Sequence, residues 1–314
     1  MIQIGVIIGI KRSSMNENKL KIIFWGTGPL AESALYALYQ NGYVPEYVVT
    51  KPDSAIGRKQ IMTPPMIKKW CEIKGVKVLQ PESLKNLDNT NAENENKTHP
   101  LLEKYDLAIV ASYGKIIPEN ILNIPTYGFL NVHPSDLPRY RGPSPIESAL
   151  LAGERALIVS IMKLDAGMDS GPILIKQSMD MSMLDTAQSL ELKAGQIGGE
   201  LLSQIIPHYI DGTLIPKDQN HNEATICKFI EKSQGEIKLA DNIEEIKNKW
   251  RAFYPWPGIF FFIKHKIHDE EKDIRIKISE FNLLEENRES CILKVIPEGK
   301  SEMTFEDFKR GYLK

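Results

Sequence analysis

The chain has 314 residues, a formal net charge of −2 and 42% hydrophobic residues. This length suits two domains, and the composition is typical of a water-soluble globular protein rather than a disordered or membrane-spanning one. The nearly balanced charge excludes a global positive field that would mark a nucleic-acid-binding protein, although a local basic patch stays open.

The first 19 residues are expected to form an N-terminal extension of little structural consequence. The apolar run in MIQIGVIIGIKRSS is about ten residues long, whereas a bilayer-spanning helix needs about 20. Lys11 and Arg12 follow this run, while a signal peptide would carry its charge before it. Together with three well-separated cysteines, these features predict a cytoplasmic protein without a membrane span.

Residues 20–209 alternate between apolar runs and amphipathic stretches. The alternation predicts an α/β domain with a Rossmann-like, mostly parallel sheet and helices on both faces. The expected strands are 20–25, 44–50, 76–79, 106–111, 128–132, 156–163 and 172–177, and the expected helices are 30–39, 64–74, 146–152 and 186–209. The Asn-rich tract 86–98 interrupts this pattern, and we interpret it as a surface loop.

The pattern changes beyond residue 209. Residues 210–224 are polar and rich in turn-forming residues, which predicts a linker. Residues 225–314 contain short apolar runs at 258–264, 273–281 and 290–296, and one helical stretch near 241–252. They are expected to form a smaller, barrel-like domain of the OB type.

The turn Gly26-x-Gly28 follows the first expected strand and opens a helix, as a dinucleotide-binding turn does. Asp53 lies downstream, near the place of an acidic ribose ligand, so an NAD-dependent dehydrogenase is one interpretation. The signal is weak, because any strand-to-helix corner of a doubly wound fold favours glycine there. Asp53 also falls in an expected loop, and we therefore expect no NAD.

A more specific pattern lies at the end of the strand expected at 128–132. Asn131 and His133 are two residues apart there, and a loop with four prolines follows, which makes the segment rigid. Ligands of open parallel sheets bind at the carboxyl ends of strands, and Asp169 sits in a glycine-flanked turn that could face this edge. An amide and a carboxylate-oriented imidazole would aim two hydrogen bonds at an oxygen that becomes negative during attack on a carbonyl.

No serine or cysteine occurs in a nucleophile elbow, so the attacking group should come from the substrate. The pattern thus predicts acyl transfer by direct nucleophilic attack. His265 and His268 are the nearest approach to a metal-ligand pair, and on a strand their rings would point to opposite faces. We therefore predict no metal.

At these residues the chain resembles the folate-dependent formyltransferases. The likeness is carried by NVHPS at 131–135, LPRYRG at 137–142 and DAGMDSG at 165–171. The resemblance implies that 10-formyltetrahydrofolate donates a formyl group to an amine. It also implies that Asn131 and His133 hold the oxyanion of a tetrahedral intermediate, while Asp169 supports His133 and relays the proton that leaves the amine.

Two further segments are similar to folate-contacting parts of that family. Residues 135–138 match a segment that contacts the folate, although Asp136 replaces the apolar residue more usual there. SYGKIIP at 112–118 resembles the wall of the pterin pocket, where a flat heterocycle fits an apolar slot. The candidate folate-contacting residues are Ser135, Asp136, Leu137, Pro138, Tyr113, Gly114 and Ile116.

Motifs in the C-terminal part of the sequence indicate which molecule accepts the formyl group. WRAFYPWPG at 250–258 and EGKSEM at 298–303 are similar to the methionyl-tRNA formyltransferases, and this resemblance covers roughly residues 20–312. It implies that initiator methionyl-tRNA accepts the formyl group and that the C-terminal domain binds tRNA. We expect the protein to be a monomer.

In that family the loop after the second strand wedges into the tRNA acceptor stem. Here Arg58 and Lys59 could meet phosphates or bases, while Ile61 and Met62 could unstack the terminal base pair. In the C-terminal domain, Lys249 and Arg251 are further candidates for tRNA contact.

Other functions stay open from the sequence. An N-formyltransferase for a nucleotide-linked amino sugar, or a formyltetrahydrofolate hydrolase module, would share the three catalytic side chains. A non-catalytic RNA-binding protein would need none of them. Residues 220–314 carry 17 Lys and Arg against 18 Asp and Glu, so an RNA-binding role requires positive charge to gather on one face.

Overall fold

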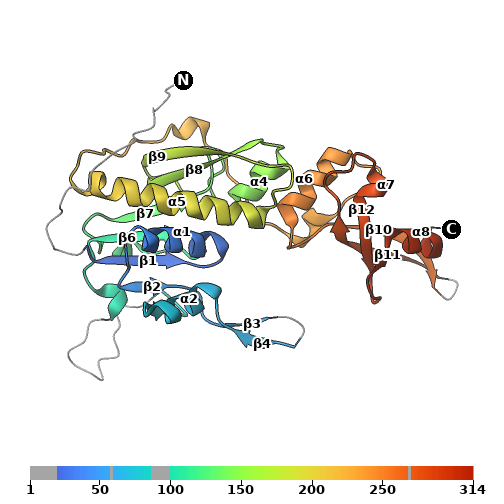
Figure 1. The fold of residues 1–314 in the computed structure, drawn as a ribbon, viewed down its shortest axis with the longest axis horizontal. Helices are drawn as coiled ribbons and strands as arrows, with labels where there is room; N and C mark the ends of the chain where they lie inside the picture. Colours follow the sequence, from blue (N-terminus) through green and yellow to red (C-terminus); the bar gives the residue numbers. More distant parts are fainter. Residues whose placement is uncertain (1–19, 57–58, 86–98, 268–269, 314) are drawn as a thin grey trace.

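The structure is a computed structural model that describes residues 20–56, 59–85, 99–267 and 270–313. The expected N-terminal extension 1–19, the Asn-rich tract 86–98 and Arg58 lie outside these described residues. The described residues form a seven-stranded sheet, a two-stranded hairpin and a four-stranded C-terminal sheet, which lie in separate regions of the molecule (Figure 1).

The seven-stranded sheet confirms the predicted α/β fold. Its strands follow the order β5-β2-β1-β6-β7-β8-β9, in which the first five run parallel and β8 is antiparallel to both neighbours. Strands β1, β6 and β7 are buried at every position, which explains the continuous apolar runs of β1 and β6, whereas β7 also buries Asn131 and His133. The bounds are β1 Ile22–Gly26, β2 Tyr47–Val49, β5 Lys77–Leu79, β6 Leu107–Ala111, β7 Phe129–His133, β8 Ala156–Lys163 and β9 Ile173–Asp180.

Helices α1 (Pro29–Gln40), α2 (Met66–Lys74), α4 (Pro145–Leu151) and α5 (Ala187–Ile210) occur where the sequence predicted helices. Helix α5 lies against α1 and β7 along the length of the sheet (Figure 1). A Cβ on Gly195 would overlap the Leu30 carbonyl oxygen, and a Cβ on Gly198 would overlap the Val132 side chain. These glycines allow the close approach that fixes β7, the strand that carries Asn131 and His133.

The segment after β2 is a hairpin rather than the plain loop that the sequence indicated. Strands β3 (Ser54–Ile56) and β4 (Ile61–Thr63) pair in antiparallel register and project from the edge of the molecule (Figure 1). Three-residue strands are shorter than the runs from which periodicity can be recognised, so this hairpin was missed.

The predicted small β domain is confirmed as an antiparallel sheet in the order β10-β11-β12-β13. Ile276, Ile278 and Val295 fill its inner face, and Phe261 packs edge-on against Phe308. The short elements α3, α7, α8 and β13 were not predicted. The bounds are α3 Glu119–Leu122, α6 Ile243–Phe253, β10 Phe260–Ile267, β11 Glu270–Phe281, α7 Arg288–Cys291, β12 Ile292–Pro297, β13 Met303–Thr304 and α8 Phe305–Tyr312.

The stretch between the two sheets is attached to the larger one over much of its length. Lys217 exchanges two backbone hydrogen bonds with Ile173, and Cys227 donates its N–H to the Arg141 carbonyl. We call residues 217–228 the strap. It lies along the loops that follow β7 and β8, so the expected linker contributes to the surroundings of the candidate site. Among the described residues, no helix combines the length and apolar character of a membrane crossing.

Candidate active site

Strand β7 presents Asn131 and His133 at the carboxyl edge of the sheet. The side chains of residues two apart on a strand point to the same face. Both residues are buried, and β7 is held between β6 and β8 by pairs such as Val110 with Asn131 and His133 with Ser160. The two polar side chains are therefore held rigidly beside each other at this edge.

Asp169 is held in place by the turn between β8 and β9. Its φ of 47° lies in the left-handed region, which aspartate tolerates better than most residues. The Asp165 carboxylate shapes the turn by accepting the Gly167 N–H at 3.0 Å and the Ser170 hydroxyl at 2.8 Å. A Cβ on Gly171 would overlap the Lys163 carbonyl oxygen, so only glycine allows the turn to close this tightly.

The structure brings the three candidate catalytic residues together. Asp169 Oδ1 lies 3.4 Å from Asn131 Nδ2 and 3.8 Å from His133 Nδ1. The second distance is longer than a hydrogen bond but within reach of an ion pair. The other carboxylate oxygen, Oδ2, accepts the Gly142 N–H at 2.8 Å. An amide, an imidazole and a carboxylate thus converge over one small region at the sheet edge.

The orientation of the His133 ring follows from its contact with the proline-rich loop. Its Nε2 lies 3.0 Å from the Tyr140 carbonyl oxygen. Because a carbonyl oxygen can only accept, Nε2 must carry the hydrogen, and Nδ1 is the atom that faces Asp169. Tyr140 has a φ of 57°, so Tyr140 and Asp169 both hold backbone conformations that non-glycine residues rarely adopt.

A residue of the strap, Gln219, joins the catalytic turn to the proline-rich loop. Its Nε2 donates to the carbonyl oxygens of Asp169 at 2.9 Å and Gly171 at 2.7 Å. Its Oε1 accepts from Arg141 Nε at 3.1 Å and Nη2 at 2.7 Å. Gln219 and Arg141 are both buried, so their two mutual bonds and the bond to Gly171 are shielded from water, while the bond to Asp169 is partly buried.

The sequence did not reveal Gln219, because a polar residue in a polar stretch has no local signature of burial. Arg141 belongs to the LPRYRG motif, from which the resemblance implies no role for it. Its Nη2 also bonds His221 Nδ1 at 3.0 Å, and its backbone N–H donates to the Thr225 carbonyl at 2.9 Å. The strap and the loop are therefore interlocked through side chains and backbone.

Most folate-contact candidates lie in two neighbouring loops. Residues 112–116 follow β6 and residues 134–138 follow β7, and these parallel strands are paired, so both loops leave the same edge. Ile116 is 92% exposed, and Gly114 has a φ of 71°. An exposed isoleucine beside a glycine turn suits the apolar wall of a flat ligand.

The remaining loop candidates have structural partners. Ser135 donates its hydroxyl to the Arg139 carbonyl at 2.8 Å and is buried, as is Leu137, while Pro138 follows directly. Asp136 forms an ion pair with Lys176 of β9 at 2.6 Å. The charge at Asp136, unusual for the resembling family, is therefore balanced on the strand beside it.

Tyr113 does not have the position that was predicted for its side chain. It is 2% exposed and packs edge-on against Trp25, with ring centroids 5.1 Å apart. Burial raises the pKa of its hydroxyl to about 12. The phenol belongs to the core under the sheet, so only the backbone of Tyr113 is placed to face a ligand.

The candidate tRNA contacts fall into two groups. Lys59, Ile61 and Met62 are exposed on the hairpin, and the two apolar side chains are 61% and 62% exposed. Lys249 is half-buried, and its Nζ donates to the Glu236 carbonyl at 2.7 Å. The three hairpin residues are therefore available to a large partner, whereas Arg58 lies outside the described residues.

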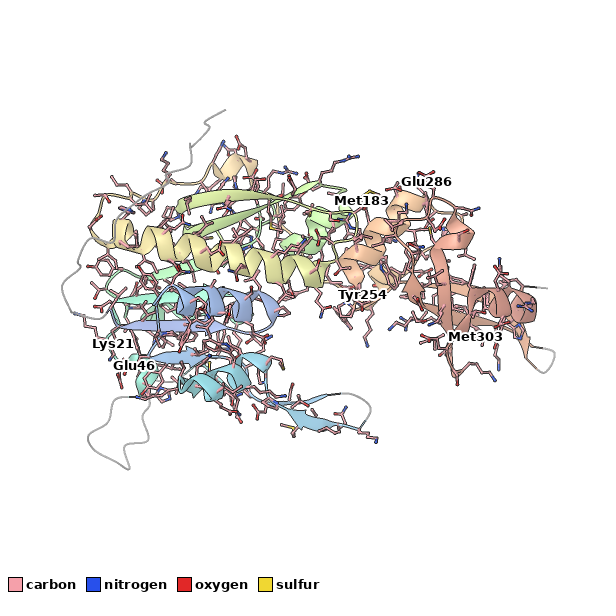
Figure 2. All side chains as sticks on the ribbon, in the orientation of Figure 1. Lys21, Glu46, Met183, Tyr254, Glu286 and Met303 are labelled. Atoms are coloured by element: carbon pink, nitrogen blue, oxygen red, sulfur yellow. The ribbon has the colours of Figure 1, made fainter. Side chains whose placement is uncertain are left out.

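The prediction that Arg251 contacts tRNA does not fit its position, because the side chain is only 9% exposed and faces the larger sheet. Its Nε donates to the Asp185 carbonyl at 2.8 Å, and its Nη2 donates to the Ser182 carbonyl at 3.0 Å. Met183 of that turn and Tyr254 at the end of α6 lie at the junction between the two sheets (Figure 2). A guanidinium occupied there stabilises the junction and is not free to contact phosphate.

Asp53, the candidate ribose ligand, is also occupied. Its carboxylate accepts from Gln80 at 2.7 Å and from Lys68 at 2.9 Å, and these two hydrogen bonds lower its pKa. Within the described ranges, no group of three or more His, Cys, Asp or Glu side chains is arranged to hold a metal ion.

Known proteins match this chain over most of its length. Residues 19–206 match the family described as formyl transferase, and residues 229–291 match the formyl transferase C-terminal domain. The methionyl-tRNA formyltransferase of Chloroflexus aurantiacus is 40% identical over 243 residues, covering 77% of this chain and 76% of that protein. The methionyl-tRNA formyltransferase of Dehalococcoides mccartyi strain CBDB1 is 36% identical and covers 94% of this chain and 96% of its own.

A solved structure shows the same fold. The N-formyltransferase of Helicobacter canadensis, in complex with folinic acid and dTDP-3-aminofucose, superimposes with a TM-score of 0.56 at 18% identity. The superposition covers 88% of this chain and 94% of that one.

Proposed function

Because this chain belongs to the formyl transferase family and is a formyl-transferring enzyme, we propose that it formylates the amino group of initiator methionyl-tRNA, with 10-formyltetrahydrofolate as donor. The observation that carries the proposal is the convergence of Asn131 and His133 on one oxygen of Asp169. The methionyl-tRNA formyltransferase of Dehalococcoides mccartyi matches both sheets of this chain, which supports the choice of acceptor.

The proposed reaction begins with attack of the acceptor amine on the formyl carbon. As the carbon becomes tetrahedral, its oxygen gains negative charge. Asn131 Nδ2 and a protonated His133 Nδ1 are the donors placed to bind that oxygen, since His133 Nε2 is held by Tyr140. Preorganised donors of this kind stabilise the transition state because they need no rearrangement when charge develops.

The attacking amine must also lose a proton. Asp169 is the nearest carboxylate to both oxyanion donors, and its Oδ2 is fixed by the Gly142 N–H. We infer that Asp169 accepts the amine proton and passes it to the folate nitrogen as the carbon–nitrogen bond to the donor breaks. The proton balance then closes without any further acid or base from the protein.

The donor would lie between the loops 112–116 and 134–138. The exposed Ile116 and the glycine turn at Gly114 fit the flat face of a pterin, and both loops leave the sheet beside His133. The acceptor would approach from the hairpin side, where Ile61 and Met62 are exposed and can pack against a terminal base pair.

The assay that tests the proposal offers radiolabelled 10-formyltetrahydrofolate with methionyl-tRNA in one arm and with a nucleotide-linked amino sugar in the other. We expect label in the tRNA arm. Formylation of the sugar alone would contradict the proposal and support the second candidate, which the likeness to the Helicobacter canadensis structure keeps in view.

A matched pair of variants tests the site itself. His133→Ala should lower kcat by about 10²- to 10³-fold, the usual effect of losing one oxyanion donor, while circular dichroism shows an intact fold. His208→Ala changes a residue at the C-terminal end of α5 whose ring contacts Thr213 of the following turn, and it should leave kcat unchanged. Equal rates for the two variants would refute the assigned role of His133.

A further inference from the structure

A single residue of the proline-rich loop, Tyr140, determines which way the His133 ring points. Its carbonyl oxygen lies 3.0 Å from His133 Nε2 and accepts the hydrogen of that nitrogen. The φ of Tyr140 is 57°, and non-glycine residues are strained in this left-handed region. Such a conformation persists only where surrounding contacts enforce it. The contacts that hold the Tyr140 backbone therefore also hold the His133 ring.

Thr225 of the strap bonds the backbone on both sides of the Tyr140 Cα. Its hydroxyl oxygen accepts the Tyr140 N–H at 2.8 Å, and its carbonyl oxygen accepts the Arg141 N–H at 2.9 Å. The Arg141 N–H and the Tyr140 carbonyl belong to one planar peptide group. The second bond thus fixes the plane of the carbonyl that faces His133, while the first bond fixes the peptide group before it.

The side chain of Tyr140 is held by different contacts from its backbone. Its ring hydroxyl donates to Glu154 Oε1 at 3.0 Å, in the connection between α4 and β8. The Arg139 guanidinium lies 4.9 Å from the centroid of the same ring and forms an ion pair with Glu154 at 2.7 Å. The Thr225 hydroxyl is the contact that a substitution can remove most cleanly, because valine has nearly the shape of threonine but carries no hydroxyl.

We propose that Thr225 is a positioning residue for formyl transfer, an inference that rests on the role of His133 in the proposed function. Through Tyr140 it keeps His133 Nε2 bonded, so that Nδ1 stays directed to Asp169, 3.8 Å from Oδ1. Nδ1 is the nitrogen assigned to the oxyanion. A ring released at Nε2 can turn about its bond to Cβ, and Nδ1 then spends part of its time away from the oxyanion. Thr225 acts on the reaction through these two residues and touches no reacting atom.

Substitutions of Thr225 test the role of its hydroxyl. Thr225→Val should lower kcat about 10-fold, less than the 10²- to 10³-fold effect of losing the His133 donor itself, and leave KM for both substrates unchanged. Thr225→Ser keeps the hydroxyl and should retain kcat to within about twofold of the parent. Thr225 is exposed, so water can reach the freed Tyr140 N–H and circular dichroism should show an intact fold.

Thr213→Val is the matched control for the loss of a threonine hydroxyl. Thr213 is exposed like Thr225, and its hydroxyl donates to Asp211 at 2.6 Å in the turn after α5. This variant loses a hydrogen bond of the same kind at a place without contact to the proline-rich loop, and kcat should stay unchanged. A loss equal to that of Thr225→Val would refute the specific role of Thr225.

A double-mutant cycle with His133 separates positioning from a general weakening of the site. In the His133→Ala background no ring is left to orient, so Thr225→Val should change the residual kcat by less than about twofold. A merely structural role would lower kcat by about 10-fold in both backgrounds. Equal effects in the two backgrounds, or a parent-like kcat for Thr225→Val, would overturn the inference.

A spectroscopic readout decides the question without turnover. In enzyme labelled with 15N-histidine, the Nε2–H signal of His133 is assigned by its loss in His133→Ala. This signal should shift in Thr225→Val and stay at the parent position in Thr225→Ser and Thr213→Val. An unshifted signal in Thr225→Val would show that the hydroxyl does not hold the bond between Tyr140 and His133.

The outcomes separate this inference from the proposed function. The rates are measured with whichever acceptor the parent enzyme formylates, and the NMR signal needs no acceptor. A parent that formylates no methionyl-tRNA contradicts the proposed function and leaves the test of Thr225 intact. Independent effects of Thr225 and His133 in an enzyme that does formylate methionyl-tRNA refute the positioning role alone.

Discussion

Replacing Gln219 by leucine tests whether the strap supports the catalytic turn. Leucine fills a similar volume but removes all four hydrogen bonds, two to Arg141 and one each to the carbonyls of Asp169 and Gly171. Arg141 Nη2 keeps its bond to His221, so three groups lose their partner: the buried Arg141 Nε and Gly171 carbonyl, and the partly buried Asp169 carbonyl.

The expected cost follows from those three groups. A buried polar group without a partner costs about 1–3 kcal/mol, and water reaching the partly exposed turn favours the low end. A loss of about 3 kcal/mol in the free energy of unfolding results, which lowers Tm by roughly 6–12 °C for a domain of this size. The Asp169 backbone, strained by about 1–3 kcal/mol, is then free to relax away from His133, and kcat should fall about 10- to 100-fold.

The assay compares Tm and steady-state formylation for three variants. Gln219→Glu keeps an acceptor for Arg141 but loses both donors to the turn, so its kcat should fall like that of Gln219→Leu while its Tm falls less. Asp218→Ala changes the preceding, exposed residue and should alter neither quantity. If Gln219→Leu is folded at the assay temperature and its kcat stays within about twofold of the parent, the strap does not position Asp169.

Other regions of the chain offer independent tests. Gly195→Ala should lower the free energy of unfolding by about 1–3 kcal/mol in denaturant titrations, because the added Cβ meets the Leu30 carbonyl. Gly311→Ala is the control and should not lower this free energy, because a Cβ there has open space. Arg251→Gln should lower Tm but keep the salt slope of tRNA binding, since its partners are the carbonyls of Ser182 and Asp185. Replacing Ile61 and Met62 together by serine should raise KM for tRNA and leave KM for the folate donor unchanged; equal KM values for tRNA would exclude the hairpin from acceptor binding. Burial, with the charge of Glu147 as a smaller cause, raises the pKa of Glu191 from 4.5 to about 7, so the folded state retains a proton that the unfolded state releases. Stability is then lost as pH rises between these values, and thermal melts should find Glu191→Gln more stable than the parent at pH 8 but not at pH 4.

The sequence was sufficient for the parts of the site that one chain segment determines. Asn131 and His133 are close because they share a strand, and a period of two places them on one face regardless of the rest of the fold. Asp169 was identified through the glycines around it, because its turn needs backbone conformations that few residues adopt. Long apolar runs likewise predicted the central strands of the sheet.

The parts that the sequence left hidden depend on contacts between distant segments. Gln219 and Arg251 are polar residues in polar surroundings, and only the approach of another segment buries them. Tyr113 and Gly114 are adjacent in the sequence, yet the first points into the core and the second lies at the edge. Local patterns cannot settle which way a side chain points where a strand turns into a loop.

The strap alters where the enzyme can be divided. The first family match ends at residue 206 and the second begins at residue 229. The stretch between them would therefore be the obvious place to join this chain to the C-terminal domain of a relative. A junction at residue 206, where the first match ends, would replace Gln219 and Thr225 with the relative's residues. The segment bonded to the Asp169 turn would then come from the other protein. We expect a junction after Lys228, whose carbonyl accepts the Ser144 hydroxyl, to keep the strap intact and to preserve catalysis.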